Sequence, residues 1–376
     1  MEVKIAHCSD FHLGVKNGSS KTAITNVERK KVLLEVIEKC KQQAAQLLLI
    51  SGDFFDDVKV SPSEVEEIKT ILSSCPEIKI FISPGNHDPF TPDSPYAVYK
   101  WPQNVYIFKN TNIDYFELPE LKTRVWGAAF RSIYQTEGML SKIPELSRDF
   151  LNICMMHGTV TAKDKDYYNP IKLSEIENSH MNYIALGHIH KKTPISKIND
   201  TFYAYSGSPF GNGFGETGDK GIYIGIISQN NCDLKFQKIN SRNYEKLTLT
   251  LSSADNYSEL SNFIIKEIQH HYGENFAQNL YEITLSGSIK EDFLIDPKYL
   301  ELLLQNKLFF VKIIDKTTVE INVEKLAFRN DFKSMFIKKT LQRIDAAQSE
   351  EEKNLLEKAL KIGIKAFTED ITCYED

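Results

Sequence analysis

Residues 78–88 read Ile-Lys-Ile-Phe-Ile-Ser-Pro-Gly-Asn-His-Asp, an apolar run followed at once by polar side chains. The first five residues are typical of a buried strand, and the Pro-Gly pair that follows predicts a turn. Asn86 can offer a neutral oxygen to a cation, His87 can donate a proton, and Asp88 can hold the imidazole ring that does so. The stretch predicts a strand whose carboxyl end is followed by polar side chains that can bind a cation or transfer a proton.

Two stretches upstream show the same arrangement. The apolar residues 3–8 lead to Ser-Asp-Phe-His, and residues 47–50 lead to Ser-Gly-Asp-Phe-Phe-Asp-Asp. Helical periodicity over residues 26–46 and a Ser-Pro-Ser-Glu cap at residues 61–64 predict two intervening helices. This alternation predicts a parallel sheet covered by helices, in which the carboxyl ends of the strands face one crevice.

Shorter predicted strands follow, and three more histidines stand at their ends. We expect these strands at residues 105–108, 124–130, 151–156, 183–186, 202–205 and 221–227. His157 follows the third of them, and His188 and His190 follow the fourth. Two strand-rich halves that meet over one site predict a β-sandwich with flanking helices.

The strand ends together supply seven candidate metal ligands: Asp10, His12, Asp53, Asn86, His157, His188 and His190. This sulfur-free set of oxygen and nitrogen donors suits Mn, Fe or Zn. Seven ligands exceed the needs of one ion, whereas two ions that share a carboxylate would use them all, and such pairs promote displacement at phosphorus. The four other histidines have no such context and are expected to be structural or surface residues: His7, His180, His270 and His271.

Taken in order, these clusters resemble the five motifs of the calcineurin-like metallophosphoesterase superfamily. The matching motifs are Asp10-x-His12, Gly52-Asp53-x-x-Asp56, Gly85-Asn86-His87-Asp88, His157 and Gly187-His188-x-His190. Within the superfamily, the chain is similar to the SbcD-type DNA repair exonucleases and especially to their YhaO-like bacterial branch. The resemblance implies an α/β (α+β) fold, a four-layer metallophosphoesterase β-sandwich flanked by helices, and a metal-dependent phosphodiesterase that acts as a DNA nuclease.

The resemblance also implies two divalent ions, for which we expect Mn²⁺. One ion would be held by Asp10, His12, Asp53 and His190. The other would be held by a group that shares Asp53 as a bridge, namely Asp53, Asn86, His157 and His188. His87, oriented by Asp88, would protonate or steady the leaving oxygen. Asp56 stands where archaeal and eukaryotic relatives carry a histidine, and it either orients a neighbouring ligand or caps the next helix.

Beyond the motifs, the pattern predicts three parts. Residues 1–240 carry the motifs, residues 244–322 form a small α+β domain, and residues 323–376 form a C-terminal helical segment. The resemblance implies that the first part is the phosphoesterase domain and the second a cap that positions DNA. The resemblance implies an SMC-like coiled-coil ATPase as partner. The C-terminal helices either dock that partner or fold back on their own domain. A homodimer stays an open alternative.

The composition and net charge of the chain limit which functions and cellular locations we expect. The chain has 376 residues, 41% of them hydrophobic, and a net charge of −6, so a basic face for DNA is not evident from composition. Local candidates for phosphate contacts are Lys191, Lys192 and Arg242. No apolar run is long enough for a membrane span, no secretory signal is visible, and the six cysteines form no CxxC pair, so we expect a cytoplasmic protein.

Two other functions remain open at this point. The chain could hydrolyse small phosphodiesters or phosphoproteins, for which a catalytic domain without cap and tail would suffice. It could also be a scaffold that has lost its chemistry, although the complete ligand set together with His87 argues against that alternative.

Overall fold

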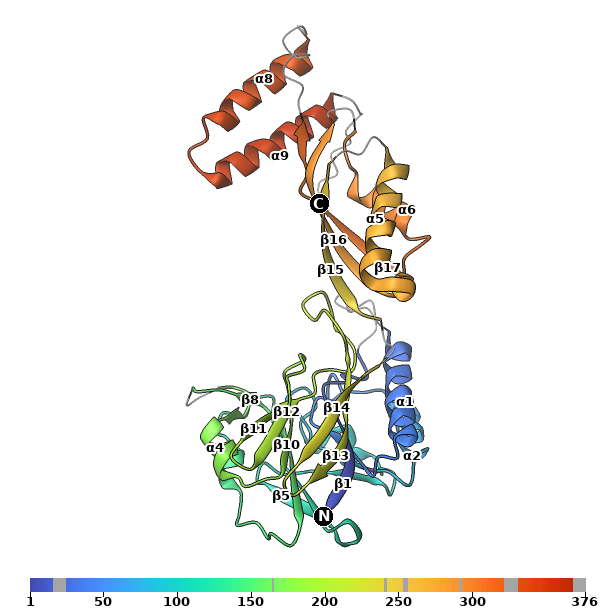
Figure 1. The fold of residues 1–376 in the computed structure, drawn as a ribbon, viewed down its shortest axis with the longest axis vertical. Coiled ribbons are helices and arrows are strands. Elements are labelled where there is room, and N and C mark those ends of the chain that lie inside the picture. The colour runs from blue at the N-terminus through green and yellow to red at the C-terminus, as the bar shows by residue number, and fades with distance from the viewer. Residues whose placement is uncertain are drawn as a thin grey trace. The chain divides into compact units, whose positions relative to one another are not determined.

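The computed structural model describes residues 1–15, 25–163, 166–239, 242–252, 256–290, 293–320 and 331–367. The chain divides into two compact units, Met1–Asn243 and Tyr244–Asp376 (Figure 1). The predicted end of the phosphoesterase domain at residue 240 and the predicted boundary at residues 322 and 323 lie outside the described residues.

The first unit contains two six-stranded sheets. The first sheet has the order β14 (Cys232–Lys238), β13 (Gly221–Ser228), β1 (Glu2–Cys8), β2 (Leu47–Ile50), β3 (Lys79–Ile82) and β4 (Val105–Ile107). Strands β1 to β4 are parallel, and Cys8 lies opposite Ile50, which lies opposite Ile82. Three motif-bearing strands therefore end level with one another at one edge of the sheet.

The second sheet brings its own histidines to a strand end. Its order is β11 (Ser196–Ile198), β12 (Thr201–Tyr205), β10 (Tyr183–Gly187), β7 (Leu151–His157), β6 (Thr123–Gly127) and β5 (Asp114–Leu118). Strands β7 and β10 are parallel, and His157 lies opposite Gly187. The last residue of each strand thus stands directly before or within a predicted metal motif.

The two sheets pack face to face, and helices cover their outer faces. Apolar residues of both sheets fill the space between them: Val3, Ile5, Leu47, Leu49, Phe81, Val125, Ile153, Met155, Tyr183 and Ala185. Helices α1 (Asn26–Gln42) and α2 (Pro62–Ser73) cover the first sheet, and α4 (Leu173–Asn178) covers the second. Figure 1 shows α1 and α2 on the side opposite α4. The predicted four-layer β-sandwich with flanking helices is confirmed.

Local sequence explains where the covering helices begin and end. Ser61 accepts a hydrogen bond from the backbone N–H of Glu64 at 3.3 Å, and Pro62 occupies the first turn of α2. Helix α1 ends at Gln42, earlier than the periodicity predicted, because Ala44 adopts a left-handed conformation (φ 51°) that turns the chain toward β2. The remaining short elements of this unit are α3 (Pro95–Val98), the 3₁₀ turns Pro119–Leu121 and Leu140–Lys142, β8 (Thr159–Val160) and β9 (Pro170–Ile171).

The second unit is built on a four-stranded parallel sheet. Strand β16 (Leu280–Lys290) lies between β15 (Tyr244–Leu251) and β17 (Phe310–Asp315), and β18 (Thr318–Glu320) pairs with its far end. Helices α5 (Tyr257–Tyr272) and α6 (Pro297–Leu304), with a 3₁₀ turn at Gly273–Gln278, share a core with one face of this sheet. The unit therefore has its own hydrophobic core.

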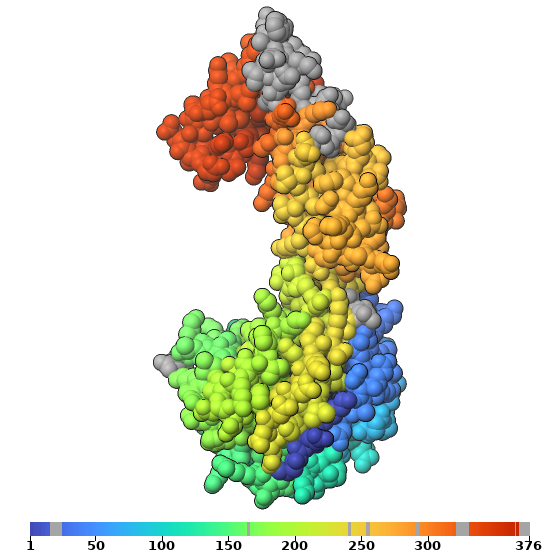
Figure 2. Space-filling model, viewed as in Figure 1, coloured from blue at the N-terminus to red at the C-terminus, as the bar shows by residue number. Residues whose placement is uncertain are grey.

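Helices α8 (Phe332–Asp345) and α9 (Glu350–Ala366) belong to the second unit and are its red part in Figure 2. Ile337, Leu360 and Ile364 are buried together and pack on Leu294 and Val319. Other apolar side chains of the same helices are exposed: Phe332, Met335, Leu355 and Ile362. The helix pair thus folds back on its own unit through one face and leaves apolar groups on another.

Two further sequence expectations concern the whole chain. Within the described ranges, no helix combines the length and the apolarity needed to cross a bilayer. Cys8, Cys40, Cys75, Cys154 and Cys232 are all free thiols. Burial raises the pKa of Cys154 and of Cys40 to about 12, so these thiols remain protonated and unreactive near neutral pH.

Candidate metal centre

The loops after the strands are tied to one another through their backbones. The N–H of Asp10 donates to the carbonyl of Gly52, and the N–H of His12 donates to the carbonyl of Asp53, both at 2.9 Å. Asp10, His12, Asp53 and His188 all have positive φ, at 58°, 45°, 48° and 96°. Residues other than glycine rarely adopt this conformation, and here four such residues lie together in the loops that carry the candidate ligands.

Two glycines make room for this crowded edge. A Cβ on Gly52 would lie 2.1 Å from the imidazole Nδ1 of His157, and one on Gly85 would lie 2.2 Å from Oδ1 of Asp53. Gly52 also has a φ of 90°, which an L side chain rarely adopts. The glycines of the motifs therefore serve the close approach of the neighbouring polar side chains.

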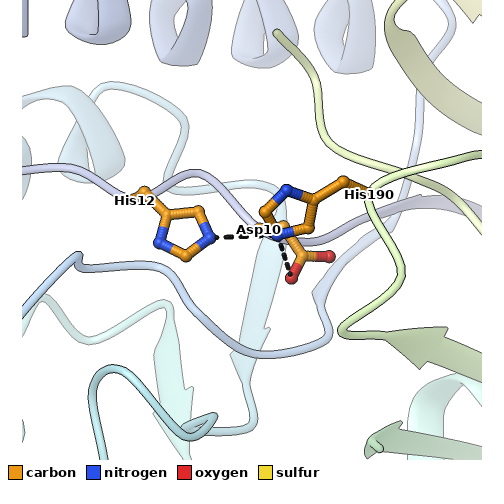
Figure 3. A group of neighbouring side chains, drawn as sticks. All are labelled: Asp10, His12 and His190. Atoms are coloured by element: carbon orange, nitrogen blue, oxygen red, sulfur yellow. Dashed lines mark hydrogen bonds and ion pairs between the residues drawn. The ribbon is translucent and has the colours of Figure 1, made fainter. Parts of the chain in front are cut away.

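The first cluster consists of Asp10, His12 and His190, whose ligand atoms lie within 4.8 Å of one another (Figure 3). The Nε2 atoms of His12 and His190 are 3.2 Å apart, and Nε2 of His190 is 3.5 Å from Oδ1 of Asp10. Each of these nitrogens that carries no hydrogen offers one lone pair, which a cation between the two rings could accept.

The second cluster lies on the other side of Asp53. Nε2 of His157 is 3.0 Å from Oδ1 of Asn86 and 3.4 Å from Oδ2 of Asp53. Ligand atoms of Asp53, His157 and His188 all lie within 4.8 Å of one another. The same Oδ2 is 3.8 Å from Nε2 of His12 in the first cluster. Oδ1 of Asp53 accepts the backbone N–H of His87 at 2.9 Å, which turns Oδ2 toward both clusters.

Two imidazoles, those of His157 and His190, have their outer nitrogen hydrogen-bonded to an acceptor, and the outer nitrogen of His12 has no hydrogen bond but lies beside a carboxylate. Nδ1 of His157 is 2.9 Å from the carbonyl of Ser51, and Nδ1 of His190 is 2.7 Å from Oε1 of Glu216. Nδ1 of His12 is 3.2 Å from Oδ1 of Asp56, an ion-pair distance. An acceptor at Nδ1 fixes the ring and leaves Nε2 for a metal ion. All three Nε2 atoms face the interior of the site.

Of the two expectations for Asp56, the structure does not support capping of the next helix. Its carboxylate lies beside a neighbouring imidazole, whereas Ser61 caps the helix that follows. Sequence reasoning missed Glu216, which lies 26 residues beyond His190 in a glycine-rich loop. That loop was the one available signal, since glycines allow a chain to approach a site closely.

Glu216 is part of a partly buried hydrogen-bond network that also contacts the His12 segment of the first cluster. Its Oε2 accepts the N–H of Asn212 at 3.1 Å, and the side-chain oxygen of Asn212 accepts from Arg29 at 2.9 Å. The fully buried Arg29 guanidinium also donates to the carbonyl of His12 at 3.1 Å. Arg29 and Glu216 together connect the segments that carry the two facing imidazoles.

The electrostatics of the site fit a divalent cation. Asp10 and Asp53 are buried carboxylates, which need positive charge nearby. Burial opposes the ionisation of Asp53, but the His157 imidazole holds the pKa of that carboxyl well below its usual range. Burial also opposes protonation of His157, yet Asp53 raises its pKa to about 9. A proton on His157 thus supplies the balancing charge that a cation would supply, and the oxygen and nitrogen donors present suit such a cation.

The expectation that Asp88 orients His87 is wrong. Asp88 is fully buried, and its carboxylate accepts the N–H of Gly85 at 2.7 Å, the N–H of Phe55 at 2.9 Å and the hydroxyl of Tyr96. Consecutive side chains of the turn point in opposite directions, so Asp88 stabilises the loop from inside.

His87 instead lies exposed at the mouth of the site. Its Nδ1 is 3.2 Å from the carbonyl of Asp56, and its ring centroid is 4.7 Å from that of His12. Ligand atoms of His12, Asp53 and His87 also lie within 4.8 Å of one another. The geometry therefore allows His87 to act on a substrate or to approach a metal ion.

The three basic residues proposed for phosphate contacts lie outside this cluster. Nζ of Lys192 is 3.5 Å above the ring of Phe236, Arg242 pairs with Glu28 at 2.8 Å, and Lys191 is exposed. In the second unit, two lysines of the open sheet face share one carboxylate: Lys246 and Lys312 lie 3.1 Å and 3.0 Å from Glu282. Arg242, Lys246 and Lys312 are thus each paired with a carboxylate.

Comparison with known proteins gives consistent matches. A family model described as calcineurin-like phosphoesterase matches residues 3–192, half of the chain and a span that includes all seven predicted ligands. The chain is 23% identical over 308 residues to the Bacillus subtilis protein named uncharacterized metallophosphoesterase YhaO, covering 77% of this chain and 74% of that one. It is 25% identical over 364 residues to the DNA double-strand break repair protein Mre11 of Saccharolobus solfataricus, covering 87% and 85%.

Two solved structures also resemble the chain. A dimetal phosphatase from Danio rerio has a TM-score of 0.40 and 10% sequence identity, over 63% of this chain and 99% of that one. A purple acid phosphatase from yellow lupin (Lupinus luteus) has a TM-score of 0.38 and 10% identity, over 63% and 52%.

Proposed function

The chain belongs to the calcineurin-like phosphoesterase family, and we propose that it hydrolyses phosphodiester bonds of DNA with two divalent metal ions. The observation that carries this proposal is the position of Asp53, whose Oδ2 lies 3.4 Å from an imidazole of one cluster and 3.8 Å from an imidazole of the other. A carboxylate so placed is suited to bridge two ions. Bound ions would lower the pKa of water and stabilise negative charge on the phosphate.

The residues of the chain have distinct parts in this proposal. Asp10, His12 and His190 hold one ion, and Asn86, His157 and His188 hold the other, with Asp53 shared. His87 stands exposed beside the first cluster, where it can give a proton to the leaving oxygen. Glu216 and the Ser51 carbonyl would keep His190 and His157 turned toward the ions, and the Asp56 carboxylate lies beside His12.

DNA is favoured as substrate by one comparison and one feature of the chain. The relative named as a DNA double-strand break repair protein matches over 85% of its length, which extends the similarity well beyond the catalytic unit. The second unit carries none of the clustered ligands and has its own core. A hydrolase of small phosphodiesters or of phosphoproteins would not need that unit. We propose Mn²⁺ as the activating ion because the site lacks sulfur ligands.

The proposed function includes a protein partner. We propose an SMC-like coiled-coil ATPase as partner, and the exposed Phe332, Met335, Leu355 and Ile362 of α8 and α9 support a docking surface there. Such apolar groups on a helix pair commonly mark an interaction site. The alternative is that a second copy of this chain binds to this surface and forms a homodimer.

The test is a metal-screened hydrolysis assay of the purified full chain. Substrates are single-stranded DNA, double-stranded DNA, an aryl phosphodiester and a phosphopeptide, each with Mn²⁺, Fe²⁺, Zn²⁺ or Mg²⁺. We expect Mn²⁺-dependent cleavage of DNA that the Asp53→Asn variant lacks. Hydrolysis of the phosphopeptide with no cleavage of DNA would overturn the proposed substrate, and hydrolysis by the metal-stripped chain would overturn the proposed chemistry.

A further inference from the structure

A row of aromatic rings runs from the metal centre to the surface. The His157 and His188 centroids are 5.2 Å apart, and the Tyr168 ring lies 4.9 Å from His188. Tyr134 continues the row at 6.1 Å from Tyr168, and Tyr167 ends it at 5.6 Å from Tyr134. The row begins at a buried candidate ligand and ends at side chains that are 58% (Tyr134) and 65% (Tyr167) exposed.

Backbone hydrogen bonds fix the two segments that carry these tyrosines. The N–H of Gln135 donates to the carbonyl of Tyr167 at 2.9 Å, and the N–H of Thr159 donates to the carbonyl of Tyr168 at 3.0 Å. The Asp166 carboxylate accepts the N–H of Tyr167 at 2.6 Å and forms a turn that presents both rings.

Asn169 connects the segment that carries Tyr167 and Tyr168 to the metal centre. It is fully buried with a φ of 46°, its Nδ2 donates to the carbonyl of His157 at 2.8 Å, and its Oδ1 accepts the N–H of Met139 at 2.9 Å. The rings therefore hold a fixed place relative to a candidate ligand of the second cluster.

Core packing does not account for the outer two rings. Tyr134 and Tyr167 contact each other while most of each side chain is in water, and neither belongs to the hydrophobic clusters of the unit. Aromatic side chains usually stabilise a fold because they are buried, and more than half of each of these two side chains is exposed. Exposed aromatic side chains beside a phosphate-hydrolysing centre match the way proteins bind unpaired nucleobases, by stacking on the flat face of each base.

We propose that Tyr134, Tyr167 and Tyr168 form a stacking subsite for the base of a nucleotide next to the phosphate at the metal centre. The subsite would select unpaired nucleotides, in single strands or at frayed ends, because a base within a duplex already uses both of its faces. It would tolerate any base sequence, since every base has such a face. This inference deepens the proposed DNA hydrolysis and rests on it.

The first test measures binding without turnover. The probe is a short single-stranded oligonucleotide with phosphorothioate linkages and terminal 2-aminopurine, whose fluorescence falls when it stacks on an aromatic ring. We expect quenching by the full chain with Mn²⁺. The Tyr134→Ala/Tyr167→Ala variant should lose the quenching and bind between about 5- and 150-fold more weakly, as expected when base–aromatic stacking is removed. The matched Phe variants should retain both.

The control variant is Tyr115→Ala, which removes an exposed tyrosine of β5 that instead contacts Trp126 and Arg124. It should bind the probe as the wild type does. Loss of binding in the Phe variants equal to that in the Ala variants, or no loss in either, would overturn the stacking subsite. Unchanged thermal melting and metal content confirm that each variant is folded.

The second test compares cleavage of two oligonucleotides that are identical except at the terminal nucleotide. One carries its base there, and the other has an abasic sugar. The wild type should prefer the substrate with the base, chiefly through KM, and the Ala variants should treat both alike while cleaving the abasic one as fast as the wild type does. Equal cleavage of both by the wild type would refute the subsite and leave the proposed DNA hydrolysis standing. Cleavage of neither would refute that hydrolysis itself.

Discussion

The two clusters that share Asp53 differ in how their imidazoles are oriented. His157 of the second cluster is buried, and a backbone carbonyl, that of Ser51, holds its Nδ1. In the first cluster, the Glu216 carboxylate holds His190 through a hydrogen bond, and the Asp56 carboxylate lies at ion-pair distance from His12. A backbone group of the sandwich thus positions His157, whereas His190 depends on a side chain that lies 26 residues further along the chain.

The two kinds of acceptor differ in how easily a mutation removes them. A backbone acceptor persists through any substitution that preserves the fold, but a carboxylate acceptor is removed by a single mutation. The first cluster also lies nearer to His87 and the exposed mouth of the site. The part of the centre closest to the proposed chemistry is therefore the part that can be altered without disturbing the fold.

The largest effect is expected from Asp53→Asn, which removes the negative charge that both clusters share. The amide keeps the size of the side chain but offers an N–H₂ group where a cation needs an oxygen. Metal content, measured by mass spectrometry of the dialysed protein, should fall at both positions, and DNA hydrolysis should be abolished. A variant that retains two ions and the wild-type rate would refute a shared carboxylate.

A large but purely kinetic effect is expected from His87→Ala. General acid catalysis typically contributes about 10²–10⁴-fold, so kcat should fall by about that factor while metal content is unchanged. The measurement is steady-state hydrolysis beside metal analysis of the same sample. Because His12, Asp53 and His87 also lie within ligand distance, loss of one ion in this variant would instead make His87 a ligand.

A smaller effect, confined to the first cluster, is expected from Glu216→Ala. Freeing Nδ1 of His190 removes the hydrogen bond at 2.7 Å that holds the ring, and such losses typically weaken metal binding by about 10–100-fold. Calorimetric titration with Mn²⁺ should show one weakened and one unchanged affinity. Glu216→Gln keeps an acceptor at the same place and should lose less. Equal weakening of both affinities would contradict the independent support of the two clusters.

The smallest effect is expected from Ser51→Ala. The hydroxyl of Ser51 is buried and has no hydrogen-bond partner, while its carbonyl holds His157. Removing an unpartnered buried hydroxyl should leave the free energy of unfolding unchanged or slightly raised. Mn²⁺ affinity should be unaffected at both positions. A loss comparable to that of Glu216→Ala would show that the second cluster, too, depends on a side chain.

Local sequence was enough to predict the strand ends and the residues that they carry. His157 is the last residue of β7, and Asn86 follows β3, because an apolar run and the polar turn after it are neighbours in the chain. The parallel pairing of β1, β2 and β3 then brings their ends together. The fold and the set of candidate ligands follow from these local patterns combined with sheet topology, whereas the division of the ligands between two ions came from the family resemblance.

Side-chain direction and long-range support could not be predicted in the same way. Asp88 and His87 are adjacent, yet one points into the core and the other into solvent, and only the turn's φ and ψ angles decide which. Glu216 reaches His190 across a loop whose path the sequence does not define. The edge strands β5, β11 and β14 were also missed, because half-exposed strands lack a continuous apolar run.

The most direct measurement of the central claim is anomalous diffraction from crystals of the full chain soaked in Mn²⁺. Two ions sharing one carboxylate should give two peaks roughly 3.5–4 Å apart, one on each side of the Asp53 carboxylate. The first should be bounded by Asp10, His12 and His190, and the second by Asn86, His157 and His188. A single peak, or two peaks of which one lies beyond the reach of Asp53, would contradict the account.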